Sequence, residues 1–360
     1  MPRELLHVWL MPWALFPEPV EFGSIGIWDF YKEGPARVAD SQEMLWLSQL
    51  MSCFKDRTGR ELTNVSVVQH GTEAFGRQGA EGNYKIRWAG NAIAFCYLIG
   101  IIQNMVLGKV RFDHPGESEC FQLMGFVIDE DGMLYYTEAR TTGTTELKEK
   151  YVSFNEPPHI SGRHSAPDRL LMAALARLND TQQDSDLWNQ LGVCFEWFSS
   201  TWSSAPEFSN PARFVSLMTA FESLARHDVN DRSPAMAEYA STLCDWNSLP
   251  TTEQIRRNNA NVDVNKPSKF IVDFGNYRNS FVHGSRLPHG WIKYCIADKQ
   301  FGPLEVMSLI IHAMVANLLL QAGIVHDWEP EILRHDLRQL VQALHWDTNE
   351  PIQPSPHLSR

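Results

Sequence analysis

Residues 306–325 are the most restrictive feature of the sequence, because none of these twenty residues is Asp, Glu, Lys or Arg. An uncharged run of this length is long enough to cross a lipid bilayer as a helix. Ser308, His312, Asn317 and Gln321 interrupt the run, and polar side chains of this kind are costly in lipid. We therefore expect a helix buried nearly all round in the centre of a bundle, and not a membrane span.

The second half of the chain, residues 165–346, has the periodicity of helices and little sign of strands. Apolar residues recur there every three or four positions, which is typical of helices with one buried face. Helices are expected at 168–180, 187–202, 210–228, 234–246, 266–283, 303–325 and 331–346. We predict an all-α bundle for this half, followed by a disordered tail at 347–360.

The first half, residues 1–158, has the mixed signals of an α+β domain. Strands are expected at 64–70 and 84–88, a hairpin around an Asp-Gly turn at 121–139, and helices at 41–53 and 92–107. Residues 155–168 are rich in Pro, Gly, Ser and His, which is typical of a linker. The predicted fold class is therefore multidomain, with an α+β domain followed by an all-α bundle.

The charge of the chain limits its partners. Its formal net charge is -12, which argues against a protein that coats nucleic acid non-specifically, because phosphate binding depends on Lys and Arg. Residues 254–299 are an exception, with eight Lys or Arg against three Asp and no Glu, a local balance of +5. A local basic site remains possible there.

The cysteines and the N-terminus favour a cytoplasmic protein. Six Cys are scattered without a C-x-x-C pair, as expected in a reducing compartment. The apolar segment 5–16 contains a proline and is followed by no signal-peptidase site, so we do not expect secretion. His159 and His164 have no companions that would complete a metal site, and we expect neither a metal nor a cofactor.

The predicted helix 266–283 has an apolar face made of aromatic residues. Phe270, Phe274, Tyr277 and Phe281 recur at helical spacing and form one narrow stripe toward the core. This stripe fixes which way the rest of the helix points.

The opposite face of the same helix is polar without being made of Lys and Glu. At about 100° per residue, Asn276, Asn279 and His283 lie opposite the aromatic stripe and Arg278 lies at its flank. Gly284 then ends the helix. An ordinary solvated face, with His283 favouring the helix dipole, is the alternative to a functional site.

Arg278 and His283 are about 140° apart around one helix, so a single helix does not easily direct both at one small group. Two copies of the helix across a two-fold axis could bring the arginine of one chain to the histidine of the other. The geometry therefore suggests a homodimeric site.

The four residues between Arg278 and His283, with the polar Asn279 directly after the arginine, resemble the R-x4-6-H signature of the HEPN superfamily. The upstream segment "FVSLMTAFESLAR", residues 214–226, is similar to a helix of the Apea-like HEPN group, with Phe221 where leucine is more usual. The resemblance covers about residues 168–346, and it implies a HEPN-like helical domain.

The resemblance implies a metal-independent endoribonuclease that acts as a homodimer, commonly with an antitoxin or within an anti-phage defence system. Its products would be a 2′,3′-cyclic phosphate and a 5′-hydroxyl. An imidazole exchanges protons near neutral pH, so His283 suits proton transfer. Arg278 offers a permanently charged fork for the phosphate, and Asn279 could bind phosphate or orient His283.

Two further residues are candidates for the site, and two other functions are alternatives to the ribonuclease. Glu222 occupies an acidic position where it could hold Arg278, although a pair with Arg226 is at least as good an explanation. Asn276 is a weaker candidate for RNA contact. The alternatives are a non-catalytic HEPN module that binds RNA, nucleotide or a partner protein, and a dimerisation scaffold whose N-terminal domain is the functional part.

Overall fold

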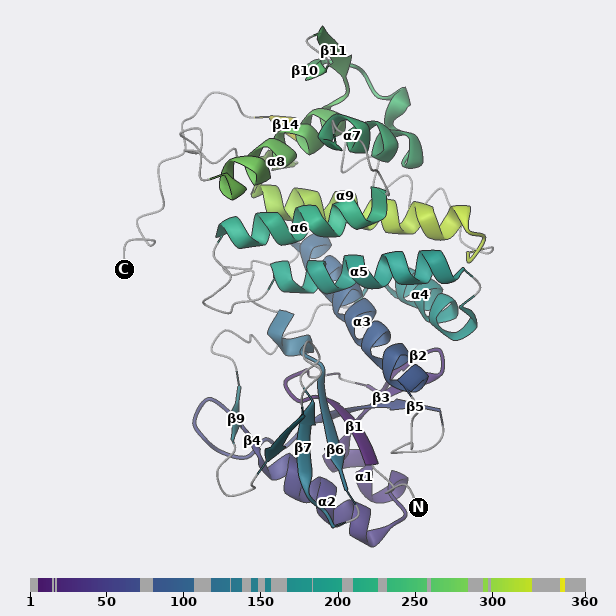
Figure 1. Cartoon of the computed structure of the whole chain (residues 1–360), viewed down its shortest axis with the longest axis vertical. Helices are drawn as coiled ribbons and strands as arrows, with labels where there is room; N and C mark the ends of the chain where they lie inside the picture. Colours follow the sequence, from purple (N-terminus) through teal and green to yellow (C-terminus); the bar gives the residue numbers. More distant parts are fainter. Residues whose placement is uncertain are drawn as a thin grey trace. The chain divides into compact units, whose positions relative to one another are not determined.

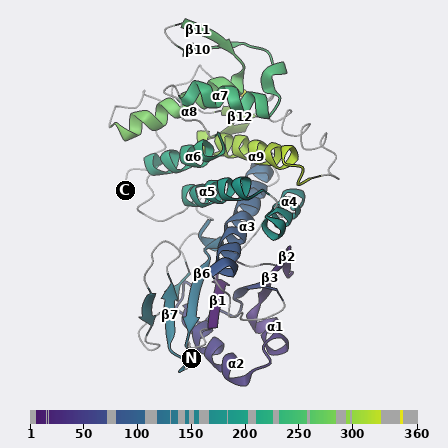
Figure 2. The same cartoon turned by 45° about the vertical axis from the view of Figure 1, so that its right-hand side comes forward.

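The computed structural model of the chain describes most of its 360 residues. The described residues are 6–14, 16, 18–71, 80–106, 118–129, 131–137, 144–147, 153–156, 167–182, 184–202, 210–225, 232–257, 260–283, 294–296, 299–325 and 344–346. They mix helices and sheets, as Figures 1 and 2 show, so the mixed α and β class is as predicted.

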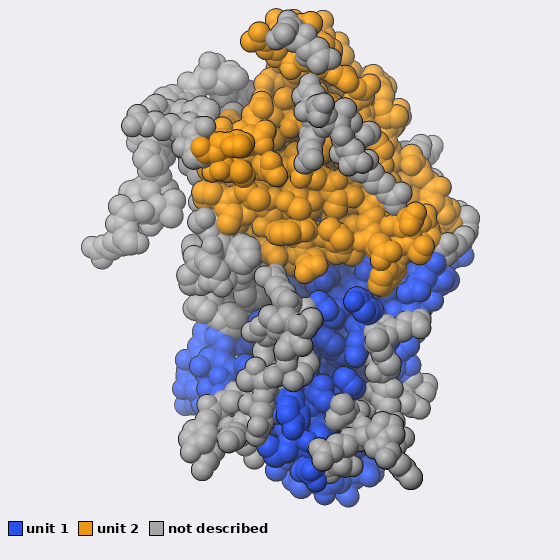
Figure 3. Space-filling view, viewed as in Figure 1, with its two compact units in different colours: residues 1–98, 113–183, 202–204 blue, residues 99–112, 184–201, 205–360 orange. Residues whose placement is uncertain are grey.

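The chain forms two compact units, coloured separately in Figure 3. Unit 1 comprises residues 1–98, 113–183 and 202–204, and unit 2 comprises residues 99–112, 184–201 and 205–360. The units differ from the predicted domain ranges 1–158 and 165–346, because helix α4 (Arg169–Thr181) belongs to unit 1. Helix α3 (Ala80–Val106) contributes residues to both units.

Unit 1 is built on a seven-stranded sheet in the order β2-β3-β5-β1-β6-β7-β8, with every neighbouring pair antiparallel. The strands are β1 (Leu6–Met11), β2 (Val20–Phe22), β3 (Ile25–Asp29), β5 (Ser66–His70), β6 (Met124–Ile128), β7 (Leu134–Thr137) and β8 (Thr144–Leu147). The apolar N-terminal segment is thus the buried central strand β1. The expected strand at 64–70 and the expected hairpin at 121–139 are present as β5 and as β6–β7.

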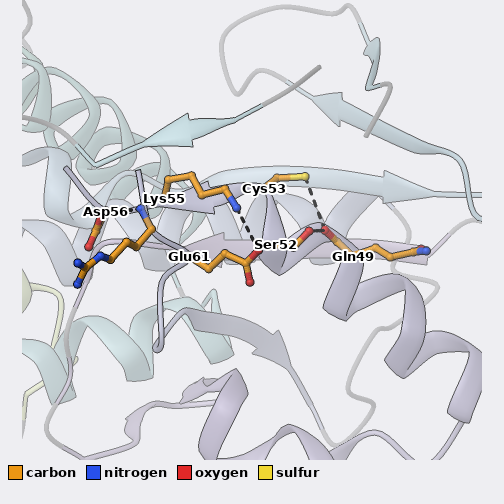
Figure 4. Close-up of polar contacts among 7 residues, drawn as sticks. Gln49, Ser52, Cys53, Lys55, Asp56 and Glu61 are labelled. Carbon is orange, nitrogen blue, oxygen red and sulfur yellow. Dashed lines mark hydrogen bonds and ion pairs between the residues drawn. The ribbon is translucent and has the colours of Figure 1, made fainter. Parts of the chain in front are cut away.

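Unit 1 also contains two short helices, a 3-10 turn and a small second sheet. They are α1 (Phe30–Arg37), α2 (Ser41–Ser52), β4 (Phe54–Lys55), the 3-10 turn η1 (Ser118–Phe121) and β9 (Phe154–Asn155), which pairs in parallel with β4. Figure 4 shows how the chain leaves α2: Ser52 Oγ and Cys53 Sγ both donate to the Gln49 carbonyl, at 2.7 and 3.6 Å, and Lys55 pairs with Glu61 at 3.2 Å. Strand β4 begins at Phe54, directly after this helix end.

Helix α4 is tied to the edge of the unit 1 sheet. Asp180 accepts hydrogen bonds from the Ser24 backbone N–H, at 2.9 and 3.0 Å, and from the Ser24 hydroxyl. The turn residue Gly23 has φ +61°, and a Cβ there would lie 2.2 Å from an Asp180 carboxylate oxygen. Glycine is therefore required at this turn both for its backbone conformation and for the close approach of α4.

The expected strand at 84–88 is wrong, because these residues lie inside α3. The alternation of "YKIRW" is short, whereas the apolar spacing continues through Ile86, Ala89, Ala92 and Ile93, all buried. A long helix with a continuous buried face outweighs a five-residue alternation. The expected helix 92–107 is therefore the second part of a longer one.

Unit 2 is mainly helical, with α5 (Ser185–Thr201), α6 (Asn210–Ala225), α7 (Arg232–Leu243), α8 (Lys266–Val282), α9 (Pro303–Gln321) and the 3-10 turn η3 (Trp246–Ser248). Helix α6 packs against α5, α8 and α9, and α7 packs against α8. The expected helix 303–325 is present as α9, and most of its residues between Pro303 and Leu319 are buried.

The prediction that this half is all-α is wrong. Unit 2 contains a two-stranded sheet of β10 (Glu253–Arg257) and β11 (Ala260–Val264), and a three-stranded sheet of β12 (Tyr294–Ile296), β13 (Lys299–Phe301) and β14 (Leu344–Trp346). The three-residue strands β12, β13 and β14 are too short to give a periodic signal of their own. Residues 344–346, the end of the expected helix 331–346, form strand β14 instead. Residues 331–343 and the expected disordered tail 347–360 lie outside the described residues.

Two helices meet the length and composition of a membrane span among the residues that the structure describes. They are Gly82–Gln103 within α3 and Pro303–Gln321, with mean hydropathy 1.2 and 1.7. Within these windows 83% and 78% of the residues are buried inside the protein. Such burial is typical of core helices.

Candidate functional site

The predicted functional helix is α8. Asn265 caps its N-terminus by accepting a hydrogen bond from the Ser268 N–H at 2.9 Å, and Pro267 follows in the first turn. Both are favoured where a helix begins. At the other end the His283 N–H donates to the Asn279 carbonyl at 3.0 Å, so His283 is the capping residue that ends the helix.

The aromatic stripe of α8 packs against α6, as its spacing predicted. Phe270 and Phe274 are buried, while Tyr277 and Phe281 are partly buried. Phe214 of α6 is their shared contact: its ring centroid lies 4.8 Å from that of Phe274 and 5.2 Å from that of Phe281. This packing determines which side of α8 remains accessible.

The polar residues of α8 lie where the helical spacing places them. Asn276, Asn279 and His283 are exposed, and Arg278 is partly buried. Helix packing thus leaves the amide and imidazole groups open to a ligand. The side chains of Asn276 and Asn279 are both outside the buried core of unit 2.

Arg278 is held between its own helix and α6. Its Nη1 donates to Asn279 Oδ1 at 3.1 Å, and its Nη2 lies 4.0 Å from Glu222 Oε2. The two charged side chains are 27% and 22% exposed, and the distance is at the limit of an ion pair, so this contact orients the arginine more than it stabilises the fold. Sequence reasoning named all three residues, and the structure brings them together.

One N–H of the Arg278 guanidinium is unpaired among the described residues. Its Nε is buried and has no hydrogen-bond partner among the described residues. A buried N–H without a partner is uncommon and calls for an explanation such as a site for an absent ligand. The guanidinium fork matches the oxygens of a phosphate or carboxylate, so an anion is the class of ligand that suits the exposed part of Arg278.

Glu222 lies on α6, where it is partly buried. The competing explanation for it, a pair with Arg226, involves a residue outside the described residues. The observed neighbour is Arg278.

Tyr277 lies next to Arg278 in sequence but serves the core. Its ring makes an edge contact with Phe214, at 6.5 Å between centroids. Burial, with a smaller effect of the Asp273 charge, raises the pKa of Tyr277 to about 12. It therefore stays a neutral phenol at physiological pH and does not place a negative charge beside Arg278.

The basic stretch 254–299 is less available than its composition suggests. Arg257 donates to Glu238 of α7 at 2.8 Å, and Lys269 pairs with Asp273 on α8. The Lys269–Asp273 spacing of four residues could have been read from the sequence, whereas Glu238 could not. Arg286 and Lys293 lie outside the described residues.

Metal ligands do not gather in the part of the chain that the structure describes: no three His, Cys, Asp or Glu side chains lie together. Comparison with known proteins finds no matching family model, no similar curated protein and no similar solved structure. The HEPN resemblance therefore rests on the motif of α8 and on the segment in α6.

Proposed function

We propose that this chain is a HEPN-type endoribonuclease that cleaves RNA without a metal ion and acts as a homodimer through α8. The observation that carries the proposal is the constellation at the end of α8. An arginine whose buried Nε is unpaired within the described part of the chain is oriented by Asn279 and Glu222, and an exposed His283 follows five residues later. This combination of a fixed cation and an accessible proton carrier suits phosphodiester transfer.

The reaction follows from these groups. The 2′-hydroxyl loses its proton and its oxygen bonds to phosphorus, the bond to the 5′-oxygen breaks, and that oxygen gains a proton. The products are a 2′,3′-cyclic phosphate and a 5′-hydroxyl. DNA is spared because it has no 2′-hydroxyl.

Each residue has one role in this proposal. A His283 imidazole moves the protons, and Arg278 stabilises the charge that builds up on the phosphorane. Asn279 and Glu222 keep the arginine in position, and exposed Asn276 contacts the RNA backbone. Because Arg278 and His283 point about 140° apart on one helix, each catalytic centre combines residues from two copies of α8.

The test is cleavage of a defined RNA oligonucleotide by the purified chain, with and without EDTA. We expect cleavage in both, with cyclic-phosphate ends identified by mass spectrometry, and loss of cleavage in Arg278→Ala and His283→Ala. Arg256→Ala removes an exposed arginine on β10 and is the matched control. Intact RNA at every concentration at which the protein is a dimer would rule out the enzyme.

A non-catalytic module that binds RNA, nucleotide or a partner protein is the second candidate. It is favoured by the contacts that Arg278 already makes, whereas the net charge of -12 opposes broad RNA binding by either candidate. Tight, salt-sensitive binding that leaves the RNA ends unchanged would support it. For either candidate, we propose that the partner is an antitoxin or another component of a defence system. We propose that the protein acts in the cytoplasm.

A further inference from the structure

The hairpin of β10 and β11 contacts the helices of unit 2 through β10. Ile255 of β10 is buried, and Arg257 of β10 bonds to Glu238 of α7. In Figures 1 and 2 the hairpin lies beyond α7, away from α6 and α9. The other strand, β11, is exposed at four of its five residues, Ala260 to Asp263.

One edge of β11 has no strand beside it among the described residues, since the sheet contains β10 and β11 alone. Two residues connect the strands, and Arg257 pairs with Ala260 at the turn. In such a hairpin the pair next to the turn is hydrogen-bonded, and alternate residues point their backbone groups outward. Asn261 and Asp263 therefore present their N–H and C=O groups to the open edge.

Exposed edges of this kind are normally blunted by Lys, Pro or a covering element. The edge strand β2 of unit 1 is only three residues long, and the turn after it is tied to α4 through Ser24 and Asp180. Strand β11 has neither Lys nor Pro, and Val262 is 38% exposed. It is therefore an edge suited to pairing.

The sequence of β11 is complementary to itself when two copies run antiparallel. With Val262 facing Val262 at a two-fold axis, Asn261 of each copy faces Asp263 of the other, and Ala260 faces Val264. This register joins the residues whose backbone groups point outward, and it places an amide donor opposite each carboxylate. No carboxylate faces another.

We propose that β11 is a contact between two copies of this chain, which pair edge to edge to form a four-stranded antiparallel sheet. A pair of five-residue strands buries much less than the about 1,200–2,000 Å² of a stable interface. The contact is therefore weak alone. It is independent of the proposed ribonuclease function.

A charge swap tests the register. Asn261→Asp places two carboxylates opposite two others across the axis, and it weakens self-association about tenfold. Asn261→Asp with Asp263→Asn exchanges the two partners and restores the wild-type association. Within one hairpin the new carboxylate would face Arg256, the cross-strand partner of residue 261, so the hairpin itself is not weakened. Sedimentation velocity over a concentration series measures the self-association of the wild type, the single variant and the double variant.

Cross-linking tests the axis directly. Val262→Cys brings two thiols together in a pair that is not hydrogen-bonded, close enough for a disulfide under a mild oxidant. Ala260→Cys is the matched control, because residue 260 faces residue 264 of the other copy. Five cysteines are buried and do not interfere: Cys53, Cys96, Cys120, Cys194 and Cys244. The protein without the Val262→Cys substitution controls for the sixth, Cys295. The same experiment in an Arg278→Ala, His283→Ala background gives the same dimer even if the ribonuclease proposal fails.

Equal association of wild type, single variant and swap would overturn the proposal, as would equal cross-linking at positions 260 and 262. Loss of RNA binding in Asn261→Asp with unchanged association would also overturn it, because β11 would then contact RNA and not a second copy.

Discussion

Helices α8 and α9 belong to the same unit and have similar lengths, but they are used differently. Both begin with a proline in the first turn. Helix α8 is buried in its first part, from Pro267 to Gly275, and becomes polar and exposed toward His283. Helix α9 is buried on all sides over most of its length.

The difference shows how stability and chemistry are divided within unit 2. An all-round apolar helix is stabilised by burial and offers no accessible polar group. A helix with one aromatic face is held just as firmly on that side, and it can carry exposed groups on the other side at little cost. Substitutions at the exposed end of α8 should therefore change activity, whereas substitutions in α9 should change the free energy of unfolding.

The largest effect is expected for His283→Ala in α8. RNA cleavage should fall by about 10²–10⁴-fold, because the proton carrier is lost. The free energy of unfolding should change by less than about 0.5 kcal/mol, because the side chain is exposed. Single-turnover kinetics and urea unfolding measure the two quantities, and a large loss of stability would show that the C-terminal end of α8 is structural.

The next effect is expected in α9. Leu319 is fully buried, so Leu319→Ala should lower the free energy of unfolding by about 2–5 kcal/mol through lost burial and a cavity. Val282→Ala in α8 is the control, because Val282 is 53% exposed and should change stability little. Equal effects in urea unfolding would remove the contrast between the helices.

A smaller effect is expected where α8 meets α7. A Cβ on Gly275 would lie 2.3 Å from the Ser233 hydroxyl oxygen and 3.0 Å from its Cβ. Gly275→Ala should therefore cost about 1–3 kcal/mol of stability through overpacking. Adding Ser233→Gly should recover part of this loss in a double-mutant cycle of urea unfolding, and strictly additive losses would show that the two residues do not interfere.

The smallest effect concerns pH and the start of α9. Burial raises the pKa of the Glu305 carboxyl above its ordinary value near 4.5, and hydrogen bonds from the Gly302 and Glu305 N–H groups partly oppose this. The folded state then holds the proton at pH values where the unfolded state has released it. Stability is therefore lost as pH rises from about 4.5 through the folded pKa, by at most about 1.4 kcal/mol per pH unit.

Glu305→Gln should remove this loss. Thermal unfolding of both proteins between pH 4 and 7 would show the wild type declining relative to the variant. If the unfolding temperatures of the two proteins change with pH in parallel, Glu305 has the same proton affinity in the folded and unfolded states.

The elements with strong local patterns could be predicted from the sequence. The aromatic stripe predicted α8 and its buried face, the uncharged run predicted the buried helix α9, and the Asp-Gly turn predicted the hairpin of β6 and β7. The strands β10 and β11 were missed, although "EQIRR" and "ANVDV" are separated by only two residues, a spacing typical of a hairpin. The strands β12 to β14 have no comparable signal, because each is only three residues long.

The sequence by itself determined which residues share a face of α8, because helical periodicity is a local property of the backbone. It therefore indicated that Asn276, Asn279 and His283 lie away from the aromatic core. Only the tertiary structure decided that Glu222 approaches Arg278 and that Arg257 pairs with Glu238. These partners lie 56 and 19 residues apart along the chain, and which helix packs beside which is decided by the fit of whole surfaces, not by local spacing.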